Sequence, residues 1–254
     1  MEEHPVLWHF TFSHFNEKAR WALDYKGIRH VRHPLVPGFH ASTVRKMTGQ
    51  TAMPVLQMNG RTIHDSTRII AALEETFPEP PLYPRAPAER ARALELEEFF
   101  DEELGPHIRR VGFHLMLPDP GFVVAAFTSE SGLAARIAMR VAFPMISVVM
   151  RKRMRIDEAG VEVSRKKTFA ALDRLERELQ PSGYLVGDRF SVADLTAAAL
   201  CSPLVAPPEF PYLPRGPMPE PMARVRESVA ARPGFRWVLE MYRRHRGRSA
   251  AIAA

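Results

Sequence analysis

Residues 53–66 read Met53-Pro54-Val55-Leu56-Gln57-Met58-Asn59-Gly60-Arg61-Thr62-Ile63-His64-Asp65-Ser66, and they contain the clearest local structural signals of the N-terminal part. Two short strand-like runs flank Asn59-Gly60, a pair typical of a tight β-hairpin turn. Asp65 and Ser66 then stand where a helix begins, ahead of the apolar spacing at 69, 70 and 73. The stretch predicts a hairpin followed directly by a helix over 66–76.

Strand and helix signals alternate on the N-terminal side of the hairpin. Residues 6–10 form a short apolar run suited to a buried strand, and residues 13–25 have helical spacing that ends near Gly27. Residues 29–35 favour a second strand, and 41–48 a short helix or an irregular turn. The order β-α-β, α, β-β-α predicts a mixed sheet of four strands with helices.

Prolines divide the chain. Five of them fall in residues 77–87, where neither a helix nor a central strand can continue. We therefore expect a first domain over 1–79, a linker over 80–88 and a second domain over 89–254. Beyond the linker nearly every pattern is helical, so the fold class is α+β with an all-α C-terminal domain. Eight prolines in 203–221 predict a long surface loop.

Composition narrows the function classes. The chain has 254 residues, 46% of them hydrophobic and 25% charged, as in a soluble globular protein. A net charge of +6 favours acidic ligands but is far below the dense positive field of a nucleic-acid binder. The single cysteine, Cys201, excludes an intramolecular disulfide and a cysteine-based zinc site. We also expect no metal site among the histidines and no secretory signal at the start.

Four motifs carry a resemblance that covers most of the chain. They are 13–20 (SHFNEKAR), 53–56 (MPVL), 64–66 (HDS) and 187–194 (GDRFSVAD). In this order and spacing, the chain resembles the cytosolic glutathione transferases of the serine type. The resemblance implies a thioredoxin-like N-terminal domain, glutathione as co-substrate, a cytoplasmic homodimer and a role in detoxification. The last motif is also a capping box at Ser191 and Asp194, which is a folding element rather than a site.

The resemblance implies that the Ser13 hydroxyl donates a hydrogen bond to the glutathione sulfur. The thiolate is the nucleophile, and a donor at a helix N-terminus stabilises it. Taken alone, a serine in this place is more often a plain helix cap. His14, where many relatives have proline, is either a second polar group near the sulfur or a side chain facing solvent.

The resemblance also implies the glutathione-binding residues. Pro54 is expected after a cis peptide bond that turns the Met53 backbone toward the tripeptide; the alternative is an ordinary strand-start proline. Ser66 is expected to bind the γ-glutamyl carboxylate and Asp65 to attract its ammonium group, although both are also ordinary capping residues. Weaker candidates for the cysteinyl-glycine end are His40 and either Gln50 or Thr51.

The expected reaction joins the glutathione thiolate to a small hydrophobic electrophile. By position alone, the pocket candidates are His14, Phe113, His114, Met116 and Leu117. We interpret residues 133–150 as a kinked core helix of the second domain, part of which faces the cleft.

An alternative function uses the same fold as a non-catalytic binding module or at a membrane surface. The basis for this alternative is the apolar stretch 133–150, which is followed by the basic segment 151–155. The basic segment 243–248 is expected to be a solvated tail, without a nucleic-acid role.

Overall fold

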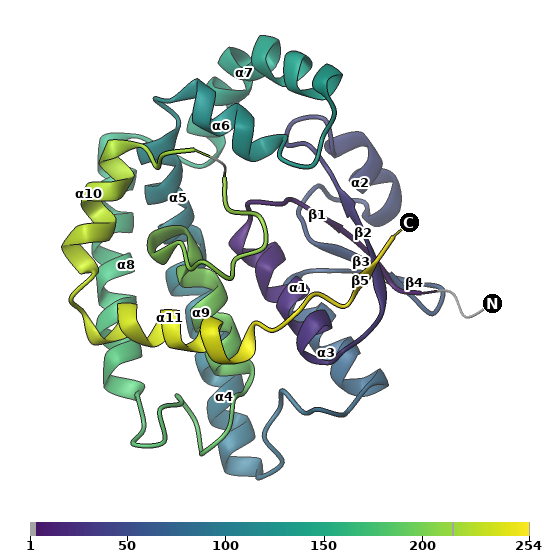
Figure 1. Cartoon of the computed structure of the whole chain (residues 1–254), viewed down its shortest axis with the longest axis vertical. Coiled ribbons are helices and arrows are strands. Elements are labelled where there is room, and N and C mark those ends of the chain that lie inside the picture. Colours follow the sequence, from purple (N-terminus) through teal and green to yellow (C-terminus); the bar gives the residue numbers. More distant parts are fainter. Residues whose placement is uncertain (1–3, 215, 254) are drawn as a thin grey trace.

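The computed structural model describes residues 4–214 and 216–253 and has two parts (Figure 1). The first part contains β1 (Val6–His9), α1 (His14–Tyr25), β2 (His30–Pro34), α2 (Ala41–Thr48), β3 (Val55–Met58), β4 (Arg61–His64) and α3 (Ser66–Thr76). The second contains α4 (Pro87–Phe99), the π-helical turn η1 (Phe100–Leu104), α5 (Gly105–Met116), α6 (Pro120–Phe127), α7 (Leu133–Arg153), α8 (Glu158–Glu178), α9 (Val192–Val205), α10 (Glu220–Val229), α11 (Pro233–His245) and β5 (Ala251–Ile252).

The sheet has the strand order β4-β3-β1-β2-β5. β2 runs parallel to β1, whereas β3 and β4 form the antiparallel hairpin that the Asn59-Gly60 turn predicts. A thioredoxin-like domain followed by a helical domain is therefore confirmed. The capping box at the start of α9 is confirmed as well, with Ser191 and Asp194 bonded to each other's backbone.

The expected four-stranded sheet has a fifth strand, because the C-terminal residues return to it. β5 pairs in parallel with β2, with His30 opposite Ala251. Arg246 directs this return: its Nε donates to Glu17 Oε1 at 2.5 Å and its Nη1 to Asp24 Oδ2 at 2.8 Å. The prediction of a solvated basic tail is wrong at this residue, since Arg246 is 2% exposed. Its positive charge neutralises two acidic side chains that α1 buries.

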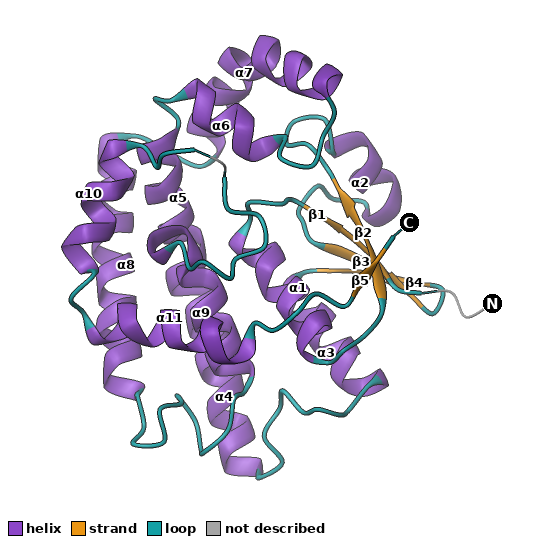
Figure 2. Cartoon of the chain, in the orientation of Figure 1, coloured by secondary structure: helices purple, strands orange, loops and turns teal. Residues whose placement is uncertain are grey.

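α1 lies between the sheet and the helical part (Figure 2), and its charged side chains are buried with it. Lys18 Nζ lies 2.8 Å from Glu97 Oε1 and 2.5 Å from Asp101 Oδ2, and it donates to Thr67 Oγ1 at 2.8 Å. Burial by itself lowers the pKa of Lys18, but the two carboxylates more than offset it and the pKa is raised. A charged Lys18 thus joins α1 and α3 to the first turns of the helical part.

α7 differs from the expected core helix. It is long and apolar enough to cross a membrane by length and composition alone, yet only 11% of its most apolar 18-residue window is buried. Met139 and Phe143 pack inward in a small core with α6, whereas Leu133 and Val141 are 72% and 78% exposed. The short α6 covers one side of α7 only, so the wide apolar face exceeds what its neighbours can bury. Figure 1 shows both helices together at one end of the molecule.

The C-terminal anchor yields a stability prediction. Replacing Arg246 by Ala leaves Glu17 and Asp24 with less compensation in a buried site, which costs about 3–5 kcal/mol of unfolding free energy. The control is Arg243→Ala: that side chain is 66% exposed, so the change stays within about 0.5 kcal/mol. Urea unfolding of both variants measures the difference. Equal effects would show that β5 is held by other contacts.

Candidate functional site

Strand register brings the predicted glutathione residues to one edge of the sheet. Trp8 of β1 lies opposite Val55, so the chain leaving β1 passes beside Met53 and Pro54. Val55 is also opposite His64, so Asp65 and Ser66 follow β4 at the same edge. The loop after β2 arrives there too, because the Leu35 amide donates to the His9 carbonyl at 2.8 Å. The residues gathered at this edge are Ser13, His40, Gln50, Met53, Pro54, Asp65 and Ser66.

Ser13 caps α1, and Asn16 fixes the direction of its hydroxyl. Asn16 Oδ1 accepts the Phe10 amide proton at 2.9 Å, which identifies the other side-chain atom as the donor nitrogen. That Nδ2 donates to Ser13 Oγ at 2.8 Å, and the Asn16 amide donates to the same oxygen at 3.4 Å. Since the oxygen is used as an acceptor, the hydroxyl proton is free to point away from α1.

Arg20 holds the loop that carries Ser13. Its Nε donates to Glu17 at 2.8 Å, and its terminal nitrogens bond to His9 Nδ1 and to the carbonyls of residues 10, 11 and 13 at 2.9–3.3 Å. These contacts use all five donors of the guanidinium. The ring of Tyr212 lies on the same guanidinium, with the centroid 5.0 Å from Cζ. One fully buried cation therefore fixes both the serine loop and part of the proline-rich loop.

The Met53–Pro54 peptide bond is cis, as expected. Within the described residues, neither backbone polar group of Met53 has a hydrogen-bond partner. The side-chain amide nitrogen of Gln50 donates within its own loop, to Thr48 Oγ1 and to the Ala52 carbonyl. His40 also bonds locally: Nδ1 accepts from the Gly38 amide at 3.2 Å and Nε2 donates to the Thr51 carbonyl at 3.2 Å. Of these residues, Met53 is the one with free backbone groups.

Asp65 and Ser66 begin α3 with different side-chain environments. Asp65 Oδ1 accepts the amide protons of Thr67 and Arg68 at 3.0 and 3.2 Å, as a cap does. Its backbone φ of 78° is in the left-handed region, which is costly for a non-glycine residue and often found at functional sites. Ser66 is buried, and its hydroxyl has no hydrogen-bond partner among the described residues. Among the described residues, the start of α3 therefore offers the Ser66 hydroxyl and the Ser66 amide, because Asp65 already occupies the amides of Thr67 and Arg68.

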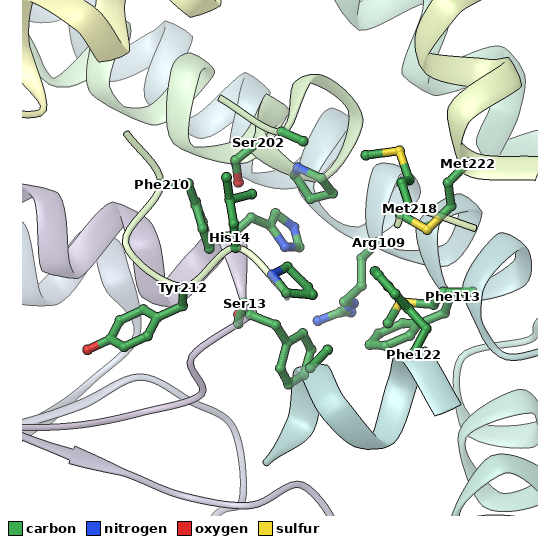
Figure 3. Close-up of a pocket in the computed structure, with 18 of the residues that line it drawn as sticks. Ser13, His14, Arg109, Phe113, Phe122, Ser202, Phe210, Tyr212, Met218 and Met222 are labelled. Atoms are coloured by element: carbon green, nitrogen blue, oxygen red, sulfur yellow. The ribbon is translucent and has the colours of Figure 1, made fainter. Parts of the chain in front are cut away.

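A cavity of about 270 Å³ opens beside Ser13 (Figure 3). Its walls come from the serine loop, α5, α6, the end of α9, the proline-rich loop and α10. Its lining side chains include Phe12, His14, Arg109, Phe113, Met116, Phe122, Met218 and Met222. Most of the surface is apolar, and the proline-rich loop supplies Phe210 and Tyr212. That loop is thus a wall of the cavity.

Two of the five predicted pocket residues lie elsewhere. His14, Phe113 and Met116 line the cavity, but His114 is exposed on another side of α5 and Leu117 is buried in the small core near α6. Phe113 and Met116 are three positions apart and share one face of α5, whereas His114 projects about 100° away from Phe113 and Leu117 follows the end of the helix. Extending the same face backward from Phe113 reaches Arg109, which the sequence reasoning missed.

His14 is a neutral group in the cavity wall. Its Nε2 donates to the Gly105 carbonyl at 2.9 Å, and burial together with the positive charge of Arg109 lowers its pKa to about 3. The alternative in which the His14 side chain faces solvent is therefore wrong. Within the described ranges, no group of three or more His, Cys, Asp or Glu side chains could hold a metal ion.

Two sequence models of one family match the chain. "Glutathione S-transferase, N-terminal domain" matches residues 7–81, and "Glutathione S-transferase, C-terminal domain" matches residues 156–236. A maleylacetoacetate isomerase of Dictyostelium discoideum is 32% identical over 110 residues, which are 41% of this chain and 50% of that protein. The chain thus matches about half the length of this curated relative.

Solved structures of similar fold cover nearly the whole chain. The β-etherase LigF of Sphingobium sp. has a TM-score of 0.62 at 22% identity, covering 94% of this chain and 99% of that one. A glutathione S-transferase of Methylobacterium radiotolerans, solved with glutathione sulfonate, has a TM-score of 0.57 at 24% identity and covers 93% and 95% of the two chains. These similarities show the fold.

The neutral His14 predicts a pH effect on stability. Between pH 7 and 5 the unfolded chain takes up a proton at this residue, whereas the folded chain does not until about pH 3. The wild-type protein should therefore lose about 2 kcal/mol more unfolding free energy than His14→Gln as the pH falls over this range. Urea unfolding at both pH values measures this. The exposed His114→Gln is the control, and identical pH dependence in all three proteins would contradict the burial of a neutral ring.

Proposed function

We propose that this chain, which belongs to the glutathione S-transferase family, binds glutathione as co-substrate and joins its thiolate to a small hydrophobic electrophile. The observation that carries the proposal is the pair of hydrogen bonds that Ser13 Oγ accepts from Asn16. Asn16 supplies hydrogen bonds to its oxygen, and the proton is left to the cavity edge. A glutathione sulfur at this edge would receive that proton in a hydrogen bond, which stabilises the thiolate.

The neighbouring loops suit the rest of the tripeptide. The free backbone groups of Met53 suit strand-like pairing with the cysteinyl residue, next to Pro54. At the start of α3, the Ser66 hydroxyl and the Ser66 amide suit the γ-glutamyl carboxylate. Asp65 is exposed at the same point, where its negative charge favours the ammonium group. His40 and Gln50 then act by shaping the loop, since their polar atoms are used within it.

The reaction begins from the bound thiolate. Its sulfur forms a bond to an electrophilic carbon, the displaced electron pair moves onto the electrophile, and a proton from solvent completes the product. His14, Phe113 and Met116 border the space where the electrophile would lie. Relatives named as an isomerase and a β-etherase suggest that the same thiolate can serve an isomerisation or an ether cleavage.

The wider setting follows from the family resemblance. We propose a cytoplasmic homodimer with a role in detoxification, in which each subunit carries its own glutathione site. Light scattering behind a sizing column tests the oligomeric state directly, because a dimer has twice the subunit mass of 28.8 kDa.

Two substitutions test the role of the hydroxyl proton. Ser13→Ala removes the donor, and loss of a charge-assisted hydrogen bond lowers turnover about 10- to 150-fold. Asn16→Asp keeps Ser13 but replaces the donor Nδ2 by an acceptor oxygen, so the hydroxyl proton turns toward residue 16. Both variants should raise the pKa of bound glutathione, measured by the ultraviolet absorbance of the thiolate. Asn59→Asp, the same change in the hairpin turn, is the control, and a wild-type thiol pKa in Asn16→Asp would remove the hydroxyl from the mechanism.

The exposed face of α7 supports a second proposal, attachment to an anionic membrane surface. Leu133, Val141 and Met145 are among its exposed apolar side chains. Residues 133–155 hold six basic residues and no acidic one. An apolar helix face flanked by basic side chains suits anionic lipid. A second copy of the chain would instead bring equal positive charges together, which opposes self-association through this face.

Vesicle co-sedimentation tests the α7 proposal. We expect binding to phosphatidylserine-containing vesicles, weaker binding to phosphatidylcholine alone, and clear loss in the double variant Arg136→Gln and Arg140→Gln. The matched control removes two exposed charges from α11, with Arg243→Gln and Arg244→Gln, and should bind as the wild type does. Equal binding by both double variants, or no binding to either vesicle, would overturn the proposal. A dimer that dissociates in Val141→Asp without any vesicle binding would assign the face to a second copy.

A further inference from the structure

Among the described residues that line this mostly apolar cavity, Arg109 is the one with a formal charge. It projects from α5 into the space beside Ser13, and Figure 3 shows it between Ser13 and Phe113. None of the described residues that line the cavity is acidic. Among the described residues, Arg109 has neither a hydrogen bond nor an ion pair, and its guanidinium lies over the ring of Phe15, with Cζ 5.7 Å from the ring centroid. Its donors therefore face the cavity unused.

The neighbouring arginine shows what a structural role looks like here. Arg110 Nε donates to the Met154 carbonyl at 2.6 Å, and its Nη1 donates to Ser164 Oγ at 2.6 Å. That side chain fastens α5 to the start of α8. Arg109 makes no such connection, although it comes from the adjacent position of the same helix. The donors of Arg110 are used within the protein, whereas those of Arg109 remain available to a ligand.

An unpartnered guanidinium in this place is costly. Burial and the charge of Arg110 lower the pKa of Arg109, and its own charge in turn helps to keep His14 neutral. A half-buried cation without a counter-charge among the described residues is poorly stabilised, and an anionic ligand would supply that counter-charge. A guanidinium matches a carboxylate well, because its two parallel donors meet both oxygens.

We propose that Arg109 binds the carboxylate of the second substrate, which makes that substrate an amphipathic organic acid rather than a neutral hydrophobic compound. The proposal rests on the proposed function and specifies its substrate class. The apolar body of the acid lies against Phe12, Phe113 and Phe122, and the flexible Met218 and Met222 adapt to its shape. Arg109 holds one end of the molecule, and Ser13 lies at the side where the thiolate would attack.

Binding of an unreactive ligand pair tests the anchor without turnover. Calorimetry compares 4-phenylbutyrate with 4-phenylbutan-1-ol, which share an apolar body and differ in the carboxylate. With glutathione present, the wild type should bind the acid about 10- to 150-fold more tightly than the alcohol. Arg109→Met should abolish this preference and leave the affinity for the alcohol within about threefold, whereas Arg109→Lys should keep part of the preference. A wild-type protein without preference would overturn the proposal.

Two controls separate the possible failures. Arg110→Met should lower the melting temperature but keep the preference for the acid, because Arg110 bonds only within the protein. The glutathione affinity and thiol pKa of Arg109→Met should equal those of the wild type. If the thiol pKa rises instead and the acid preference stays, Arg109 serves the thiolate and the proposal is wrong. If the acid binds through Arg109 but glutathione does not bind at all, the proposed function fails and the anion site remains.

Discussion

A fully buried arginine, Arg20, is the constraint on which the site depends. Its five donors end on Glu17, His9 and three carbonyls of the loop between β1 and α1, and that loop ends at Ser13. The ring of Tyr212 covers the same guanidinium and brings the proline-rich loop against the cavity. A lysine could not replace it, since a single ammonium cannot reach all these acceptors. The position of the serine hydroxyl is thus set from inside the protein.

Other buried charges of α1 are also paired with side chains from distant parts of the chain. Lys18 is neutralised by Glu97 and Asp101 from the helical part, and Asp24 by Arg32 and Arg246 from β2 and the C-terminal segment. Each buried charge is stable only while its partner is in place. One cluster therefore joins α1 to the first turns of the helical part, and a second joins α1 to β2 and the C-terminal segment.

Local chemistry made much of the fold predictable. The Asn59-Gly60 turn, the caps at Ser13 and Asp65 and the capping box at Ser191 act within a few residues, and each is present as predicted. Long-range pairing was not predictable in this way. Arg246 finds its partners more than two hundred positions earlier, and whether the apolar face of α7 is buried depends on how much surface α6 offers. At the site, the family motifs identified the sheet edge, whereas Arg109 belongs to no motif and emerged only from the cavity.

Calorimetric titration with reduced glutathione, carried out on the wild type, Ser66→Ala and the exposed control Ser228→Ala, tests whether the tripeptide binds at the start of α3. We expect micromolar to low-millimolar binding by the wild type and the control, and clearly weaker binding by Ser66→Ala, because the γ-glutamyl carboxylate would lose its hydroxyl donor. Wild-type affinity in Ser66→Ala would move the tripeptide away from α3. No binding by the wild type at several millimolar would contradict the glutathione site itself.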